Sequence, residues 1–214
     1  MSSTAVDLGF VRIHDALAVA GTRLRSMDGR SFPLAVDRWH AMPGPEENAV
    51  LDLVLPAALD VGCGPARHVL ALLGRGIPAI GIDSAESAVG FARSRGARVL
   101  HRSIFDRIPH AGRWGSALLL DGNVGIGGDP TVLLARIRRL LRTGGRALVE
   151  LEPPGVPTER LAVRAESDLG EPSRWFSWAR VNADDAAGLA DASGFICEDV
   201  WCGGERWFAR LDAR

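Results

Sequence analysis

Several residue types are missing from this chain of 214 residues, and each absence excludes a kind of chemistry. There is no lysine, so all 25 basic residues are arginine, and there is no tyrosine and no glutamine. Without lysine the chain can form neither a Schiff base nor a phosphate-binding P-loop, and without tyrosine it has no phenolic general acid. Three common catalytic strategies are therefore excluded before any motif is considered.

Cysteine is scarce, and long apolar runs are lacking. Cys63, Cys197 and Cys202 form no C-x-x-C pair, and their odd number supports no disulfide framework, which favours a reducing cytoplasm. No apolar run approaches the ~18 residues that would suggest a membrane span. The N-terminus carries Asp7 early and does not resemble a signal peptide. We therefore expect a cytoplasmic protein with no membrane partner.

What is present is typical of a globular enzyme. Hydrophobic residues make up 47% of the chain and charged residues 24%, enough apolar material for one sizeable core. The formal net charge of -1 gives no basic excess, so we expect no nucleic-acid partner. The histidines show no metal-ligand spacing, so no metal site is predicted. For the assembly we expect a monomer or a homodimer.

Residues 57–214 are predicted to form an α/β domain in which strands alternate with helices, and this pattern favours a mostly parallel sheet with helices on both faces. A helix that opens at Asp129 and Pro130 is expected to stop at Gly144 and Gly145. Gly203 and Gly204 separate two final strands, which predicts a C-terminal antiparallel hairpin. The expected strands are 58–61, 79–83, 98–101, 116–121 and 146–151, followed by 195–201 and 205–211.

Residues 1–56 are predicted to form an N-terminal extension. It should contain a helix over 11–20, a hairpin turning at Asp28-Gly29 and a helix over 46–55. Pro33 would confine the second arm of the hairpin to an edge. The loop between these elements carries Trp39, which could cover a site. A second segment, 153–183, contains a strand near 175–181 with no evident partner.

A glycine turn after the first parallel strand is the candidate ligand site. Gly62 and Gly64 lack Cβ atoms, so a ligand can approach the backbone closely. Asp83 ends the next strand, where a carboxylate can accept bonds from both hydroxyls of a ribose. These features suit either a dinucleotide or S-adenosylmethionine. The dinucleotide pattern G-x-G-x-x-G would need glycine at Arg67, and Asp60 suits the ammonium group of S-adenosylmethionine better than a pyrophosphate.

Four segments resemble motifs of the class I S-adenosylmethionine-dependent methyltransferases. They cover the first turn, the acidic end of the second strand, the loop after the third strand and the start of the fifth strand. Ala66 stands where the family usually has a third glycine. The resemblance spans about 57–152 and implies a Rossmann-like open, mostly parallel seven-stranded sheet. The segments are 59–65, 81–84, 103–109 and 140–148.

The resemblance also implies a role for each matching residue in binding S-adenosyl-L-methionine. The methionine part would lie against Gly62, Cys63 and Gly64, with Asp60 nearby. Asp83 would hold the ribose. The residues implied around the adenine are Ser84, Ile104, Phe105 and Asp106, and those implied at the methyl donor and acceptor are Asp121 and Gly122.

Alternatives stay open for several of these residues. Asp83 could instead cap a helix. Arg67 could pair with the cofactor carboxylate or with Asp60, or lie at the surface. Asn123 is the best polar candidate beside the acceptor, and its glycine-rich loop, 122–128, could either border the site or link flexibly into the next helix.

The sequence thus predicts an enzyme that transfers a methyl group to a small-molecule acceptor by in-line displacement. Asp121 and Asn123 are the candidate catalytic residues, while Asp121, Glu152 and His40 are possible bases. The extension and the segment 153–183 are expected to shape the acceptor pocket. A non-catalytic S-adenosylmethionine-binding module and, less favoured, a nicotinamide-dependent oxidoreductase are the competing hypotheses.

Overall fold

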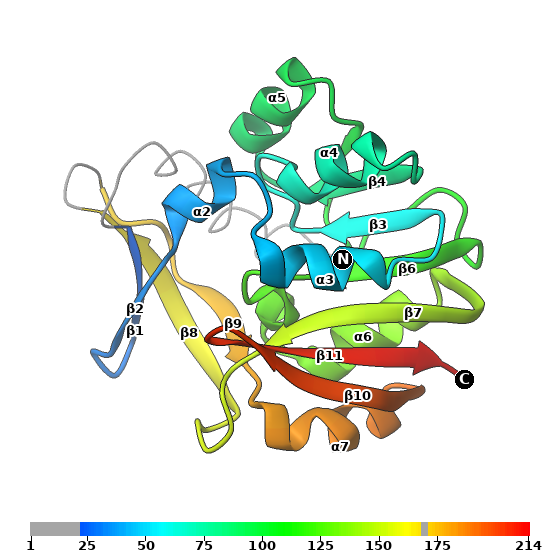
Figure 1. Ribbon diagram of the computed structural model, residues 1–214. Coiled ribbons are helices and arrows are strands. Elements are labelled where there is room, and N and C mark those ends of the chain that lie inside the picture. The colour runs from blue at the N-terminus through cyan, green and yellow to red at the C-terminus, as the bar shows by residue number, and fades with distance from the viewer. Residues whose placement is uncertain (1–21, 168–170) are drawn as a thin grey trace.

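A computed structural model describes residues 22–167 and 171–214 and contains two β-sheets (Figure 1). The helix predicted over 11–20 lies outside the described residues. Among the helices that the structure describes, none is long and apolar enough to cross a membrane.

The larger sheet has seven strands in the order β10-β11-β7-β6-β3-β4-β5. Strands β3 to β7 run parallel, and β11 and β10 add an antiparallel hairpin at one edge. The predicted fold class is confirmed. The strands are β3 (Ala58–Val61), β4 (Ala79–Asp83), β5 (Val99–His101), β6 (Trp114–Leu119), β7 (Leu141–Leu151), β10 (Phe195–Gly203) and β11 (Arg206–Ala213).

Helices cover both faces of this sheet because the strand side chains alternate between two apolar cores. Leu59 and Val61 point into the core that also contains α6 and α7, whereas Ala58 belongs to the core of α3, α4 and α5. Asp60 is two residues after Ala58 in the same strand, so its side chain points to the same face of the sheet, the one covered by α4. The helices are α3 (Pro45–Asp52), α4 (Arg67–Gly74), α5 (Glu86–Ser94), α6 (Pro130–Arg138) and α7 (Ala186–Ala192).

The prediction that Gly144 and Gly145 stop a helix is wrong. Helix α6 already ends at Arg138, and both glycines lie inside β7, which begins at Leu141. Gly144 has a φ of +68°, and the pairing of β6 with β7 shifts register at this point. Glycine tolerates a positive φ, and here that allows an irregularity within a strand. Glycines also mark the ends of helices, so the sequence alone does not distinguish the two cases.

A second, four-stranded antiparallel sheet, here called the cap sheet, combines two distant segments in the order β2-β1-β8-β9. The predicted hairpin at Asp28-Gly29 is confirmed, and β2 with its Pro33 forms an edge. The strand near 175–181 pairs with β8, which was not predicted. The strands are β1 (Arg23–Ser26), β2 (Ser31–Pro33), β8 (Glu159–Glu166) and β9 (Phe176–Arg180).

The cap sheet lies beside the carboxyl ends of the parallel strands. In Figure 1 the arrow of β3 points toward the side where β1, β2, β8 and β9 gather. A short helix, α2 (Val36–His40), stands in place of the predicted loop and leads from the cap sheet to α3. Strand β3 is also the point where strand order reverses, since β4 and β6 flank it on opposite sides, and ligands bind at such points in open α/β sheets.

Candidate cofactor and acceptor site

The glycine turn joins the end of β3 to the start of α4 in a left-handed conformation. Gly62 and Gly64 have φ values of +71° and +50°, and Ala66 follows at +64°. A Cβ atom on Gly62 would lie 2.9 Å from Nδ2 of Asn123, so only glycine fits there. Ala66 accepts a conformation that glycine adopts more easily, which accounts for the family's usual preference at that position.

Asp83 holds the turn from the neighbouring strand. Its Oδ2 accepts a hydrogen bond from the Gly64 N–H at 2.8 Å, and its Oδ1 accepts one from the Ala85 N–H at 2.9 Å. The side chain is buried but still lines a pocket. Asp83 therefore ties the ends of β3 and β4 together at the edge of that pocket.

Asn123 holds the turn from the opposite side. Its Nδ2 donates to the carbonyls of Val61 at 2.9 Å and Gly62 at 3.0 Å. The amide group predicted to face the acceptor is thus engaged with the backbone of the turn. The loop that carries it is not a flexible link, because Gly125 and Gly128 pack closely against β9.

Two pockets meet at Gly62. The first extends along the turn and α4 and includes Asp60, Cys63, Gly64 and Arg67. The second includes Asp83, Ser84, Ile104 and Phe105, four of the residues implied for the nucleoside. Asp106 does not line it; the Asp106 carboxylate accepts from the Ser103 N–H at 3.0 Å and lies at a separate surface hollow.

Asp60 lies at the base of the first pocket, and one of its carboxylate oxygens accepts no hydrogen bond. The residue is 2% exposed, and its Oδ2 has no hydrogen-bond partner among the described residues. The nearest cation is His68, whose Nδ1 lies 3.6 Å away. Burial lowers the pKa of His68, but the carboxylates of Asp60 and Glu47 outweigh it and raise that pKa to about 9. His68 is therefore a protonated imidazolium at neutral pH.

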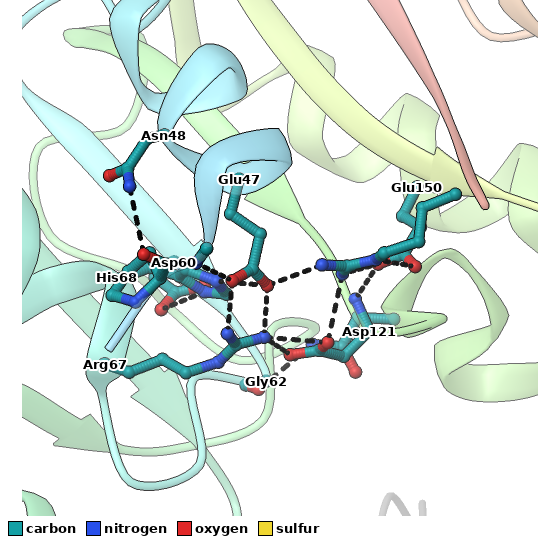
Figure 2. A network of polar contacts seen from close by, with 12 residues as sticks. Glu47, Asn48, Asp60, Gly62, Arg67, His68, Asp121 and Glu150 are labelled. Atoms are coloured by element: carbon teal, nitrogen blue, oxygen red, sulfur yellow. Dashed lines mark hydrogen bonds and ion pairs between the residues drawn. The ribbon is translucent and has the colours of Figure 1, made fainter. Parts of the chain in front are cut away.

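Glu47 is the centre of a buried ionic network (Figure 2). Its carboxylate accepts from Arg67 at 2.6 Å and pairs with Arg206 at 2.7 Å, while Nε2 of His68 lies 3.4 Å away. Burial raises the pKa of Glu47, but the three cationic partners outweigh it and hold that pKa well below its usual range. A residue of the N-terminal extension thus anchors α4 and β11 to the site.

Asp121 is held by two guanidinium groups. Arg67 donates to both carboxylate oxygens, at 2.9 and 2.7 Å, and Arg206 approaches at 3.3 Å. Arg206 also forms a paired bond with Glu150, at 2.8 and 2.6 Å. Arg67 therefore lies neither at the surface nor on Asp60, and both carboxylate oxygens of Asp121 accept hydrogen bonds from it.

The charges in this network favour an organic cation over a metal ion. Atoms of Glu47, His68 and Asp121 lie within 4.8 Å of one another, close enough for a metal site. However, Arg67 and Arg206 pair with the two carboxylates, so cationic charge is already present there. With Asp60 and Glu150 included, four carboxylates face three cations. The network therefore keeps one net negative charge, and the Asp60 Oδ2 within it accepts no hydrogen bond.

The cap sheet adds a third pocket that joins the first at Asp121. Trp39 of α2 and Trp178 of β9 line both pockets, as do Leu24 and Leu34. Trp178 contributes to the pocket wall because β9 pairs with β8 over the site. Glu47, Glu150, Arg206 and Trp178 are the site residues that sequence reasoning missed, since no local motif marks them.

Fold and site together define a Rossmann-like protein with a nucleoside-sized pocket beside a glycine turn. Residues 59–149 match the model of a methyltransferase domain family. Over these residues the chain is similar to methyltransferases, and the described fold is that of solved S-adenosylmethionine-dependent methyltransferases. A sequence comparison with curated proteins returned no match.

Solved structures support the same fold. An S-adenosylmethionine-dependent methyltransferase from Bacteroides fragilis, in complex with S-adenosyl-L-homocysteine, has a TM-score of 0.76 at 22% identity and covers 100% of this chain and 98% of its own. The 1,6-didemethyltoxoflavin-N1-methyltransferase of Burkholderia thailandensis has a TM-score of 0.60 at 17% identity, covering 79% and 78%. A sugar N-methyltransferase from Streptoalloteichus has a TM-score of 0.60 at 17% identity, and the match covers 83% of this chain and 90% of that one.

Proposed function

We propose that the protein transfers a methyl group to a small-molecule acceptor by in-line displacement. S-adenosylmethionine supplies the methyl group in activated form, on a sulfonium centre. The observation that carries the proposal is the Oδ2 of Asp60 at the glycine turn, which accepts no hydrogen bond and has only the longer ion pair with His68 at 3.6 Å. A buried carboxylate oxygen without a hydrogen bond is costly, and the ammonium group of the cofactor would donate one.

The residues present fit the cofactor in both pockets. Gly62, Cys63 and Gly64 would border its amino-acid part, where the absence of a Cβ leaves the backbone open. Its nucleoside would lie in the second pocket, beside Asp83 and Ser84. The implied contact of Asp106 with adenine requires its loop to rearrange, because that carboxylate is engaged with Ser103.

A small acceptor suits the third pocket. Its cavity volume of about 200 Å³ limits the acceptor to a small molecule, since pockets for drug-sized ligands measure roughly 300–1,000 Å³. Two of the similar structures are named for small-molecule acceptors, a didemethyltoxoflavin and a sugar. The net charge of -1 also disfavours a polynucleotide acceptor.

The chain's own contribution is positioning and the exclusion of water. Trp39 and Trp178 wall the junction between cofactor and acceptor pockets, and Asp121 stands at that junction. Holding acceptor and donor in line can supply much of the rate enhancement, because the donor needs no further activation.

Isothermal titration with S-adenosylmethionine, its demethylated product and NAD tests the cofactor assignment. We expect binding of the first two and none of NAD. Asp60→Asn should weaken binding of S-adenosylmethionine at least tenfold, because an amide cannot balance the ammonium charge. Asp52→Asn is the control, since Asp52 is exposed and pairs only with Arg75 among the described residues. Equal affinity of Asp60→Asn and wild type would contradict the proposal.

Catalysis is tested separately from binding. Protein incubated with methyl-labelled cofactor and a metabolite extract should transfer label to a small molecule. If the cofactor binds but no label is transferred, the non-catalytic binding module becomes the better hypothesis.

A further inference from the structure

The acceptor pocket is lined by carboxylates that are already engaged. Asp121 is held by Arg67 and Arg206, and Glu150 is held by Arg206. Glu152 forms a paired bond with Arg180, at 2.9 Å for both contacts. Each of these three carboxylates is therefore the ion-pair partner of an arginine rather than an unpaired base.

The other titratable groups near the site provide no base either. His68 is buried between two carboxylates and holds its proton up to a pKa of about 9. Burial and the nearby Asp83 and Asp60 raise the pKa of the Cys63 thiol well above its ordinary value. His40 is exposed, lies edge-on to Phe91 and does not line the pocket. Among the described residues, every carboxylate that lines the pocket is thus paired with an arginine, and no histidine lines it.

Arg38 is the exception among the charged residues that line this pocket. Its side chain is exposed on α2 and forms no ion pair within residues 22–167 and 171–214. Arg180, the other arginine of the lining, is bound to Glu152 and also lies 4.5 Å from the ring centroid of Phe32. The charge left available to a ligand in this pocket is thus positive.

The remaining walls are flat and apolar. Phe32, Trp39 and Trp178 contribute aromatic surface, and Leu24 and Leu34 contribute aliphatic surface. Aromatic walls of this kind favour a planar, apolar ligand body, and a guanidinium at the rim favours an anionic group on it.

Building on the proposed function, we propose that the acceptor is a flat, apolar organic anion that Arg38 recognises. The same argument explains how the reaction proceeds without a base. A lone pair on the acceptor's ionised oxygen or sulfur forms a bond to the methyl carbon, the carbon–sulfur bond of the donor breaks, and its electron pair stays on that sulfur. The acceptor loses its charge, the donor becomes a neutral thioether, and no proton is moved.

Three ligands with one ring system test the charge preference: 2-naphthoate, 2-naphthamide and 2-naphthylmethylammonium. Each is titrated calorimetrically into the full-length protein saturated with S-adenosylhomocysteine. We expect 2-naphthoate to bind at least fivefold more tightly than the amide, and the ammonium compound to bind most weakly. Arg38→Ala should remove the difference between naphthoate and amide, whereas Arg38→Lys should retain part of it.

Arg142→Ala is the matched control, because Arg142 is exposed at the start of β7, the opposite end of the strand from the site. It should leave all three affinities unchanged. Equal or tighter binding of the amide or the ammonium compound overturns the inference, as does failure of all three to bind. If S-adenosylhomocysteine itself does not bind, the proposed function fails; if it binds and the anion preference is absent, only this inference fails.

Discussion

Glu47 concentrates three cationic partners on one buried carboxylate. It is 2% exposed and also accepts from the Gly44 N–H at 3.0 Å, so its charge has little contact with water. Such a group contributes mainly by preventing uncompensated positive charge on Arg67, His68 and Arg206. This explains how one residue outside the motif-bearing domain can determine the geometry of the cofactor side.

Glu47→Gln should destabilise the protein by about 3–5 kcal/mol, because it leaves buried cations without a counter-charge. The free energy of unfolding is measured by urea denaturation. Glu46→Gln, on the same helix and without an ion pair among the described residues, should change it by less than about 0.5 kcal/mol. A Glu47→Gln variant as stable as wild type would show that the network is not structurally required.

His68 should make stability fall as the pH rises. Its pKa is raised from 6.5 to about 9 in the folded protein, so the folded state binds the proton more tightly than the unfolded chain does. The stabilisation is complete below the unfolded value and is lost as the pH rises toward about 9.

Urea denaturation across this pH range checks the assignment. Wild type and His110→Gln, which changes an exposed histidine, should both lose stability with rising pH, while His68→Gln should lose markedly less. A slope that is the same in all three proteins would assign the effect to another group.

At the scale of elements, the segment Asn123–Gly128, whose helical turns are interrupted at Ile126 and Gly127, contacts both sheets. At one end of this segment, Asn123 donates a hydrogen bond to the glycine turn. Further along it, Gly125 and Gly128 pack against β9 of the cap sheet. A Cβ on Gly125 would lie 2.2 Å from the Ala179 carbonyl oxygen and 2.7 Å from the Trp178 ring. The small residues of this loop therefore set how closely the cap approaches the site.

Gly125→Ala should destabilise the protein by about 1–3 kcal/mol, since the added methyl group meets backbone that cannot move without shifting β9. Gly188→Ala is the matched control in α7, where no atom lies within 4 Å of the new Cβ. It should stabilise the protein by about 0.5–1 kcal/mol. Thermal denaturation of the two variants measures both effects, and an undiminished melting temperature for Gly125→Ala would contradict the close packing.

At the scale of the whole molecule, the site exists only where three parts of the chain meet. The parallel strands provide the glycine turn, the extension provides Glu47 and Trp39, and the segment after β7 provides Trp178. A ligand that contacts all three parts should stabilise them together. Ligand binding is therefore coupled to the stability of the entire fold.

S-adenosylhomocysteine at one hundred times its dissociation constant should add about 2.7 kcal/mol to the free energy of unfolding. For a chain of this size that corresponds to a rise in melting temperature on the order of 5–10 °C. NAD at the same concentration should produce no rise. Differential scanning fluorimetry measures both, and equal shifts would indicate nonspecific stabilisation.

The sequence by itself determined the features that depend on neighbouring residues. The strand limits 58–61 and 79–83, the turn at Gly62 and Gly64 and the cap at Asp129 were all predicted, because backbone conformation and alternation are local properties. The family resemblance then led to the cofactor. The hairpin at Asp28-Gly29 was found for the same reason, through the residue types its turn requires.

Only the tertiary structure decided what those elements meet. It pairs β1 with β8, joins Glu47 to Arg206, and engages Asp121 and Asn123 in contacts that the motifs do not reveal. Ion pairs and sheet partners join residues far apart in the chain, and their geometry follows from packing rather than from local conformational preference. The cofactor turn could therefore be read in the sequence, whereas the charge of the acceptor pocket could be read only once the whole chain was folded around it.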